Sequence, residues 1–383
     1  MKAPKKLIFV VSVDWFFVSH RLPIALEAIK KGYEVTVMAV EEGHQGDFIR
    51  SHGIQFIPLP TTRAGMNILR ELRVLLLMFL TYLREKPDIV HHVGVKPVTY
   101  GSLICKILRI DLVVNALAGM GFLFINSEKS KWAHQLIIQL FKWGFKNPNI
   151  QFILQNEDDY AWIDGLNVLE KNQLFLIKGS GVDVNKFSFS EEPQTAKLKV
   201  LLPARMLWDK GVGEFVNAAS ILYDNYKDQV DFILCGKVDM GNKAGIPEEQ
   251  LIAWNKQRVV KWIDYQEDMV KTLHTSHIIV LPSYREGLPK ALIEACAVGR
   301  PIVTTDVPGC RTIVQDGENG ILVPVKNQEA LARAIEKLII DKSLRTTMGR
   351  LGREKVEKGF TIEKVVEKTL QIYQKTDLVF NNT

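Results

Sequence analysis

The segment HIIVLPSYREGLPKALIEACAVGRPIVT, residues 277–304, decides the fold of this chain. It begins with a short apolar run typical of a buried strand and continues through a turn that contains Gly287 and Pro289. An apolar helix at 291–298 and a second apolar strand at 302–304 follow. A strand, a helix and a strand in this order predict a parallel sheet, and open α/β sheets bind ligands at the carboxyl ends of their strands.

The same rhythm repeats along the whole chain. Runs rich in Val and Ile without clean polar alternation are typical of strands buried on both faces, as in parallel sheets covered by helices. Two successive sets of such runs predict two doubly wound α/β domains of the Rossmann type. The predicted strands are 7–13, 35–40, 54–59, 88–93, 112–116, 151–154 and 174–177 in the first set, and 199–203, 231–235, 259–263, 278–282, 302–304 and 321–323 in the second.

A polar stretch separates the two sets. The sequence SFSEEPQTAKL, residues 188–198, has no hydrophobic period and is the predicted linker. We therefore expect an N-terminal domain at 1–187 and a C-terminal domain at 199–361. The tail at 362–383 begins with a further helical pattern, which we expect to cross back onto the first domain.

The composition is that of a folded protein rather than a disordered or fibrous one. The 383 residues are 47% hydrophobic and 24% charged, with a formal net charge of +6. Most of this excess lies in the first 180 residues; it is too small for a nucleic-acid-binding protein but suits anionic lipid or a phosphate-bearing substrate. The apolar runs at 7–13 and 74–83 are too short for a signal peptide or a spanning helix. The four cysteines lack metal-ligand spacing, which predicts reduced, buried thiols.

Two glutamates mark the turn and helix of the opening segment. Glu286 lies in the turn and Glu294 about one turn inside the helix. A carboxylate accepts hydrogen bonds from two neighbouring hydroxyls, so this pair suits a sugar and a ribose. The amides around Gly287–Pro289 at the helix start suit an anion. By spacing alone, the sequence favours the alternative in which Glu286 is a solvated loop residue and Glu294 a partner of the helix dipole.

Two cations precede a helix in the segment LLPARMLWDKGVGEF, residues 201–215. Arg205 leaves the end of a predicted strand, and Lys210 with Gly211 comes just before the helix. Such a pair suits a diphosphate, because each charged hydrogen bond contributes about 1.5–3 kcal/mol. The chain has no Asp-x-Asp for a divalent ion, so the cations would stabilise the departing charge. Ion pairing with Asp209 or Glu214 is the alternative.

Candidate acceptor-side residues follow strands of the first half. After the first strand we expect Ser12 and Asp14 in a loop. His20 and Arg21 are expected at a helix start, where they either meet an anionic acceptor or cap and pack the helix. The two glycines after the fifth strand suit close approach of a ligand or an ordinary turn. The predicted acceptor-side residues are Ser12, Asp14, His20, Arg21, Gly119 and Gly121. No Gly-rich phosphate loop follows the first strand, so no dinucleotide site is predicted there.

A pair of histidines and two basic, apolar stretches each allow two interpretations. His91 and His92 end a strand and point to opposite faces, so one of them is a candidate for lining a cleft. The stretches ILRELRVLLLMFLTYLREK, 68–86, and KWAHQLIIQLFKWGFKN, 131–147, combine basic and large apolar residues. They are compatible with an anionic membrane surface or with helices that pack on the sheet and have solvated basic rims.

Taken together, these residues resemble the retaining family-4 glycosyltransferases, which have the GT-B fold of two Rossmann-like domains. The family signature of a Glu, seven residues, a Glu, a small-residue helix and Gly-x-Pro-Ile-Val matches Glu286, Glu294 and the following ACAVGRPIV. Arg205 and Lys210 match the upstream cations. The resemblance covers essentially the whole chain, most firmly 199–325, and is greatest to bacterial enzymes that extend polyprenyl-diphosphate-linked oligosaccharides, including N-acetylgalactosaminyl transferases.

The resemblance also implies residue roles. Glu294 would bind the ribose, Glu286 the transferred sugar, and Arg205 with Lys210 the diphosphate. The backbone of the turn would assist, and uracil would bind beside the end of the tenth strand. The implied donor-site residues are Arg205, Lys210, Ile263, Glu286, Gly287, Leu288, Pro289 and Glu294, of which Arg205, Lys210 and Glu286 would be catalytic. Many members have a histidine in the first domain beside the sugar, and the stretch at 118–121 has none.

We therefore expect a metal-independent, retaining transferase that moves a hexose or N-acetylhexosamine from a UDP-sugar to a lipid-linked glycan. The UDP-sugar is its donor substrate and no separate cofactor is implied. The expected location is the cytoplasm, with the protein peripheral at the inner membrane. Two rival functions are a UDP-sugar epimerase of the same architecture and a sugar-nucleotide-binding protein without catalysis. No acid/base cluster supports the first, and retention of Arg205, Lys210, Glu286 and Glu294 argues against the second.

Overall fold

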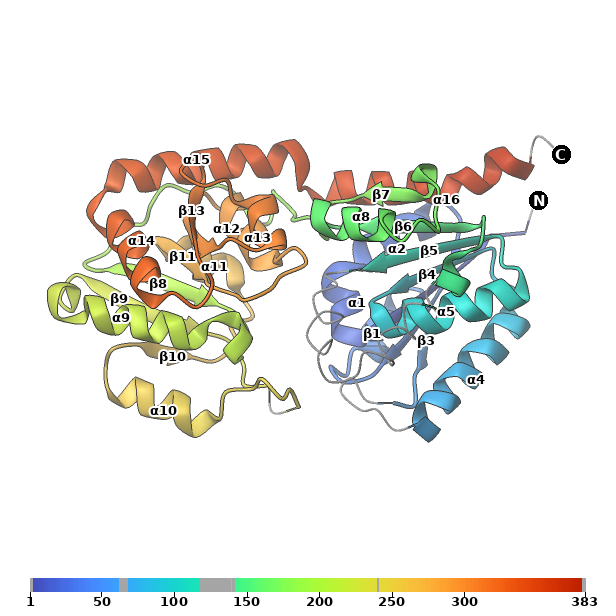
Figure 1. Ribbon diagram of the computed structural model, residues 1–383, viewed down its shortest axis with the longest axis horizontal. Helices are drawn as coiled ribbons and strands as arrows, with labels where there is room; N and C mark the ends of the chain where they lie inside the picture. The colour runs from blue at the N-terminus through green and yellow to red at the C-terminus, as the bar shows by residue number, and fades with distance from the viewer. Residues whose placement is uncertain (1–2, 62–67, 118–138, 140–141, 240, 381–383) are drawn as a thin grey trace. The chain divides into compact units, whose positions relative to one another are not determined.

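The computed structural model describes residues 3–61, 68–117, 139, 142–239 and 241–380 (Figure 1). The chain divides into two compact units. The first comprises Met1–Ser180 with Ile362–Thr383, and the second comprises Gly181–Thr361. Each contains one parallel sheet between helices, so the predicted pair of doubly wound α/β domains is confirmed.

The first unit has a seven-stranded parallel sheet in the order β3-β2-β1-β4-β5-β6-β7. Its strands are β1 (Lys6–Val13), β2 (Glu34–Val40), β3 (Gln55–Pro58), β4 (Ile89–Val93), β5 (Leu112–Leu117), β6 (Ile150–Leu154) and β7 (Leu174–Leu176). Its helices are α1 (Asp14–His20), α2 (Leu22–Lys30), α3 (Gly46–Ser51), α4 (Ile68–Glu85), α5 (Val95–Leu108), α8 (Glu157–Asp164), η1 (Lys171–Gln173) and α16 (Ile362–Phe380).

Alternate residues of β1 enter two separate cores. Phe9 belongs to the core under α1, α2, α3 and α16, whereas Val10 belongs to the core under α4, α5 and α8. Both residues are fully buried. A strand covered on both faces has no polar side, which explains why its sequence shows no alternation of apolar and polar residues.

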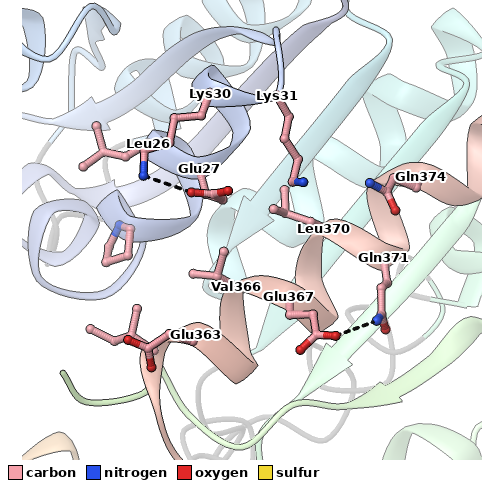
Figure 2. A pocket seen from close by; sticks show the side chains of 12 residues that line it. Leu26, Glu27, Lys30, Lys31, Glu363, Val366, Glu367, Leu370, Gln371 and Gln374 are labelled. Carbon is pink, nitrogen blue, oxygen red and sulfur yellow. Dashed lines mark hydrogen bonds and ion pairs between the residues drawn. The ribbon is translucent and has the colours of Figure 1, made fainter. Parts of the chain in front are cut away.

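The C-terminal helix α16 belongs to the first unit, as predicted. Its buried residues Val365, Leu370 and Tyr373 join the core that includes α2. A groove of about 740 Å³ lies between α2 and α16 (Figure 2). Leu26 and Val366 are among its apolar lining, and none of the candidate site residues lines it.

The second unit has a six-stranded parallel sheet in the order β10-β9-β8-β11-β12-β13. Its strands are β8 (Leu198–Pro203), β9 (Val230–Cys235), β10 (Lys261–Ile263), β11 (Ile278–Leu281), β12 (Ile302–Thr305) and β13 (Gly320–Val323). Its helices are η2 (Trp208–Lys210), α9 (Val212–Tyr226), α10 (Glu248–Lys256), α11 (Met269–His274), α12 (Lys290–Ala297), α13 (Pro308–Ile313), α14 (Gln328–Ile340) and α15 (Lys342–Gly359).

The boundary between the units differs from the predicted linker. Residues 181–198 belong to the second unit, because buried arginines bind this segment. Arg345 donates to both carboxylate oxygens of Glu192 at 2.8 Å. Arg300 donates to the carbonyl oxygen of Ser190 at 2.9 Å. A stretch without hydrophobic period is therefore fixed by ion pairs and backbone contacts that no local pattern announces.

The remaining structural expectations have definite outcomes. Each predicted strand has a counterpart in one of the two sheets. All four cysteines are free and buried, as predicted. In the described part of the chain, the helices are too short or too polar to span a membrane. The basic and apolar stretch at 131–147 lies mostly outside the described residues, and Gly119 and Gly121 lie wholly outside them.

Candidate functional site

The turn after β11 carries the first group of site residues. β11 is central, between β8 and β12, so its carboxyl end lies at the middle of the sheet edge. The chain then turns into α12, with Pro289 as the N-cap in an extended conformation. Pro289 therefore precedes the first helical residue, Lys290. Glu294 is buried one turn inside α12, as predicted.

Glu286 is held by a cation and a hydroxyl. The Lys210 ammonium donates to Oε1 of Glu286 at 2.5 Å, and the Ser283 hydroxyl donates to the same oxygen at 2.8 Å. The Lys210 and Glu286 side chains are only 20% and 10% exposed. Two residues that are 76 positions apart thus form one charged contact because β8 and β11 are neighbours. Lys210 therefore pairs with Glu286 rather than with Asp209 or Glu214, the alternative that the sequence left open.

Two glycines allow this close packing. Gly211 has φ of +71°, and a Cβ there would lie 2.1 Å from the Pro282 carbonyl oxygen. Gly309 donates its amide to the Glu286 carbonyl oxygen at 3.2 Å, and a Cβ there would lie 2.4 Å from the Gly287 carbonyl oxygen. Any side chain at either position would push the turn away from Lys210 or from α13. The Lys-Gly pair in the sequence therefore has a steric reason.

Arg205 lies beyond the end of β8 and pairs with Asp239. Its guanidinium donates to Oδ2 of Asp239 at 2.5 Å, and the two side chains are 37% and 18% exposed. Asp239 follows β9, the neighbouring strand, in a loop that has no hydrophobic period. Sequence reasoning missed Asp239 for that reason. The only available signal was its place after the end of a strand adjacent to β8.

Glu294 is a buried carboxylate with a cation beside it. Lys290, one turn earlier on α12, approaches its Oε1 at 3.5 Å. Burial raises the pKa of Glu294 above the ordinary value, and the charges of Lys290 and Lys186 oppose this rise. A buried carboxylate flanked by cations is prepared to accept hydrogen bonds from ligand hydroxyls, because its desolvation has already occurred.

The remaining predicted donor-site residues are backbone or apolar contacts. Leu288 is half-buried against the core under α12. Ile263 ends β10 and accepts the amide of Gly236 on its carbonyl oxygen at 3.1 Å. At the start of α12, the amides of Leu292 and Ile293 donate to the Pro289 carbonyl oxygen at 3.1 and 3.4 Å. Ile263 is two strands from β8 along the sheet edge, and Leu288 adjoins Glu286.

Asp14 differs from its predicted place in a loop. It is the first residue of α1 and is fully buried. Its carboxylate accepts four backbone amides, those of Trp15, Glu42, Gly43 and Gln45, at 2.8–3.2 Å. The carboxylate therefore fixes the chain after β2 against the end of β1. No local pattern signals this role, because three of the four amide partners lie 28, 29 and 31 residues further along the chain.

Of the other acceptor-side candidates, Ser12 and His20 differ from their predicted places, whereas Arg21 lies at a helix start as predicted. Ser12 is within β1 and half-buried. His20 ends α1, where its Nδ1 is 2.6 Å from the Ser19 hydroxyl and its ring stacks on Phe16. Arg21 is the N-cap of α2 and is buried, and burial lowers its pKa to about 10. Packing within the first unit thus accounts for the positions of His20 and Arg21.

His91 and His92 point to opposite faces of the sheet, as predicted, and both are buried. His91 Nδ1 is 2.5 Å from the Tyr373 hydroxyl of α16. His92 Nδ1 is 2.8 Å from the Asn115 side-chain oxygen, and its Nε2 is 3.1 Å from the Tyr82 hydroxyl. Burial lowers the pKa of His92 to about 4. Neither histidine lines a cleft, contrary to the open alternative.

Comparison with known sequences agrees with this architecture. Residues 6–157 match the family described as glycosyl transferase 4-like, and residues 183–355 match glycosyl transferases group 1. A Campylobacter jejuni relative, N,N'-diacetylbacillosaminyl-diphospho-undecaprenol alpha-1,3-N-acetylgalactosaminyltransferase, is 28% identical over 86% of this chain and 88% of its own. An Escherichia coli relative, UDP-Gal:alpha-D-GlcNAc-diphosphoundecaprenol alpha-1,3-galactosyltransferase, is 24% identical over 91% of this chain and 90% of its own.

A solved structure supports the same fold. The Anabaena protein HepE in complex with UDP superposes with a TM-score of 0.75 at 15% identity, covering 97% of this chain and all of HepE (100%). At this identity the likeness concerns the fold alone. The two family matches account for both units, and the two parallel sheets are those of the GT-B fold. The chain therefore belongs to the glycosyltransferases of the group 1 and 4-like families, with the GT-B fold.

Proposed function

We propose that this glycosyltransferase moves a hexose or N-acetylhexosamine, with N-acetylgalactosamine favoured, from a UDP-sugar to a polyprenyl-diphosphate-linked glycan, with retention of configuration. The observation that carries the proposal is the contact of Lys210 and Ser283 with Glu286 at the carboxyl end of β11. The names of both curated relatives contain a diphospho-undecaprenol acceptor. Their donors differ, which agrees with a shared acceptor class and a donor sugar chosen by few contacts.

The charged pairs of the second unit suit a diphosphate sugar. Lys210 and Arg205 each have a carboxylate partner, so each cation is already oriented and partly desolvated. The donor diphosphate would replace Asp239 at Arg205 and share Lys210 with Glu286. Glu286 would then accept a hydrogen bond from a hydroxyl of the transferred sugar. Two cations in this position would take the role of a metal ion in neutralising the leaving group.

Glu294 and the neighbouring backbone complete the proposed donor site. The Glu294 carboxylate would accept hydrogen bonds from the two ribose hydroxyls, while uracil would bind beside Ile263. The turn at Gly287, Leu288 and Pro289 would assist at the diphosphate through backbone N–H groups; Pro289 has none and would contribute by fixing the turn. Each of these positions lies within the second unit.

Retention is explained by attack on the same face that the leaving group departs from. The bond between the sugar C1 and the diphosphate oxygen breaks, the bond from C1 to the acceptor oxygen forms, and the acceptor proton passes to the leaving phosphate. The protein then supplies charge stabilisation rather than a general base. This agrees with the buried, structurally engaged states of Asp14, His91 and His92.

A polyprenyl-linked acceptor requires the transfer reaction to take place at a membrane surface. We propose a cytoplasmic protein that is peripheral at the inner membrane and meets its anionic surface, where the polyprenyl anchor of the acceptor resides. Ser12, His20 and Arg21 remain acceptor-side candidates, whereas the Asp14 carboxylate is occupied by backbone amides. Gly119 and Gly121 lie outside the described residues.

A panel of UDP-sugars tests the proposal. The purified chain is incubated with each UDP-sugar and a short-chain polyprenyl-diphosphate sugar as acceptor, both with and without EDTA. UDP release and the configuration of the product are measured. We expect transfer with one or two sugars, an α-linked product from an α-linked donor and no loss in EDTA. Transfer that stops on chelation would refute metal independence, an epimerised UDP-sugar would indicate the rival epimerase, and UDP binding without any turnover would indicate a non-catalytic protein.

A further inference from the structure

The outward face of α4 has an unusual composition. Among residues 69–85, every exposed residue is a leucine or an arginine. The five leucines are 50–69% exposed, and no exposed acidic residue interrupts them. The exposed residues are Leu69, Arg70, Leu72, Arg73, Leu76, Leu80, Leu83 and Arg84. We call this set the leucine face.

The leucine face is separate from the face that holds α4 on its sheet. Val74, Met78 and Tyr82 are buried in the core under α4 and α5. Because a helix turns by about 100° per residue, the five leucines fall within a sector of roughly 80° on the opposite side. Packing on the sheet therefore explains one apolar face of α4 and leaves the second unexplained. The sequence left two interpretations open for residues 68–86. Packing on the sheet describes one face of α4, and the anionic membrane surface is the interpretation that suits the other face.

The acidic residues of α4 do not face outward with the leucines. Glu71 accepts from the Lys96 ammonium at 2.7 Å and from the Tyr100 hydroxyl at 2.8 Å, both on α5. Glu85 is paired with Lys6 at 3.4 Å and with Arg84 at 2.8 Å. The charge presented beside the leucines therefore comes from arginines. This combination complements a surface with apolar depth and negative charge.

The helix α16 of the same unit provides the internal comparison. The exposed residues of its first thirteen positions are all polar: Glu363, Glu367, Lys368, Gln371 and Gln374. An ordinary surface helix of this unit thus presents mixed charge and amides. Isolated exposed apolar residues are normal on proteins, but a continuous row of five on one helix marks an interaction surface.

We propose that the leucine face of α4 inserts into the interfacial region of an anionic lipid bilayer. The row from Leu69 to Leu83 is about 21 Å long at 1.5 Å per residue, so α4 would lie along the membrane plane. The leucines would enter the boundary between head groups and acyl chains, and Arg70, Arg73 and Arg84 would contact lipid phosphates. This assignment rests on the proposed function only in one respect: a membrane-bound acceptor explains why the protein would bind a membrane. The leucine face itself is a feature of the first unit.

Vesicle sedimentation of the full chain tests this assignment. The probes are vesicles of phosphatidylglycerol with phosphatidylcholine and vesicles of phosphatidylcholine alone. We expect binding to the anionic vesicles that weakens as salt rises. The triple variant L72Q/L76Q/L80Q should lose about tenfold or more in partition coefficient, and R70Q/R73Q should lose mainly the salt-sensitive part.

A matched control removes three exposed apolar residues elsewhere. The variant I252Q/I340Q/L351Q changes residues of α10, α14 and α15 that are 38–70% exposed. It should bind vesicles like the unaltered chain. Equal losses in both triple variants, or no vesicle binding by the unaltered chain, would overturn the assignment. So would a dimer in solution that only L72Q/L76Q/L80Q converts to a monomer, because the face would then join two copies.

The test is independent of catalysis. Vesicle binding is measured without donor or acceptor, and UDP release from the UDP-sugar is measured without vesicles. Normal UDP release by L72Q/L76Q/L80Q shows that this variant is folded, so its loss of vesicle binding then supports the assignment. If the unaltered chain binds vesicles but transfers no sugar, the proposed function fails and the leucine face stands. If it transfers sugar but does not bind vesicles, the reverse holds.

Discussion

The two units of this protein hold their charged residues in different ways. In the second, Lys210 pairs with Glu286 and Arg205 pairs with Asp239, each through one side-chain contact at the strand ends. In the first, Asp14 is fully buried and binds four backbone amides. A single ion pair is exchanged for a ligand's charges at modest cost, whereas a carboxylate that satisfies several amides is part of the fold.

The comparison teaches where to look for chemistry in each unit. The second unit has charged groups that are desolvated, oriented and exchangeable, which is what a preorganised site for a charged donor requires. The buried polar groups of the first unit stabilise its fold. The leucine face of α4 is the surface of this unit that packing within the unit does not explain. Four predictions follow the comparison, in order of decreasing effect.

Replacing Glu286 tests the second unit most severely. The variant Glu286→Gln removes the charge that binds Lys210 and would bind the sugar, and we expect transfer to fall by about 10²–10³-fold. The measurement is kcat for UDP release with acceptor present. The control Glu354→Gln changes an exposed glutamate of α15 in the same unit and should leave kcat unchanged. Activity of Glu286→Gln within twofold of the unaltered chain would remove Glu286 from the site.

Removing Lys210 or Arg205 tests the diphosphate assignment. Each charged hydrogen bond contributes about 1.5–3 kcal/mol, so Lys210→Ala and Arg205→Ala should each weaken UDP binding roughly 10–100-fold. Calorimetric titration with UDP measures the change. Arg333→Ala, an exposed arginine of α14, serves as the matched control. Unchanged UDP affinity in both site variants would contradict the assignment, and the comparison between the units would then lose its functional meaning.

Replacing Asp14 tests the opposite side of the comparison. Because its carboxylate accepts four amides, Asp14→Asn should lower the free energy of unfolding by about 2 kcal/mol. UDP affinity should not change, since the UDP site is proposed for the second unit. Urea unfolding and calorimetry measure the two quantities. The control Asp47→Asn removes an exposed carboxylate of α3 and should change neither. A stable Asp14→Asn variant with impaired acceptor use would show that Asp14 contacts the acceptor.

Mild acid should distinguish the units by stability. Burial lowers the pKa of His92 to about 4 and that of His91 well below its usual range, with Arg21 and His92 adding to the effect on His91. The folded pKa values lie below the unfolded value, so this stability is complete above about pH 6.5 and falls as the pH drops, by about 1 kcal/mol or more per pH unit. Hydrogen-exchange protection of peptides from β4, taken relative to the intrinsic exchange rate at each pH, should fall first.

The second unit has a different acid response. Burial alone would raise the pKa of Glu192, but the hydrogen bonds and charge of Arg345 lower it overall. That contribution is present above the unfolded pKa of about 4.5 and is lost only as the pH falls below it. One buried histidine, His277, also has a lowered pKa, so the expected contrast is one of degree. An equal loss of hydrogen-exchange protection in β4 and β11 between pH 6.5 and 5 would contradict the prediction.

The sequence predicted more of the second unit than of the first. Glu286, Glu294, Arg205 and Lys210 stand at the ends of strands and starts of helices, and these positions are visible as changes of hydrophobic period. In the first unit, α1 was not predicted, and the residues before the helix start at His20 and Arg21 were expected to form a loop that contains Asp14. The stretch from 14 to 20 is apolar and short, so its period does not distinguish a helix from an extended connection.

Other errors have the same origin. The linker was placed at 188–198 because its residues are polar, whereas Arg300 and Arg345 hold part of that segment on the second unit. Asp239 was missed because its partner Arg205 is 34 residues away. In each case the decisive contact joins residues that are far apart along the chain. Local propensity and spacing carry no record of such contacts.

The sequence by itself determined the two parallel sheets, their helices and the order of the donor-site motifs. These follow from hydrophobic period and turn residues, which act over a few positions. The tertiary structure alone decided which charges meet. In the folded chain Lys210 binds Glu286, and the Asp14 carboxylate accepts hydrogen bonds from backbone amides of residues 42–45. The five exposed leucines of α4 lie outside the core. The reason is physical: strand order sets which loop ends are neighbours, and that order depends on the packing of the whole sheet.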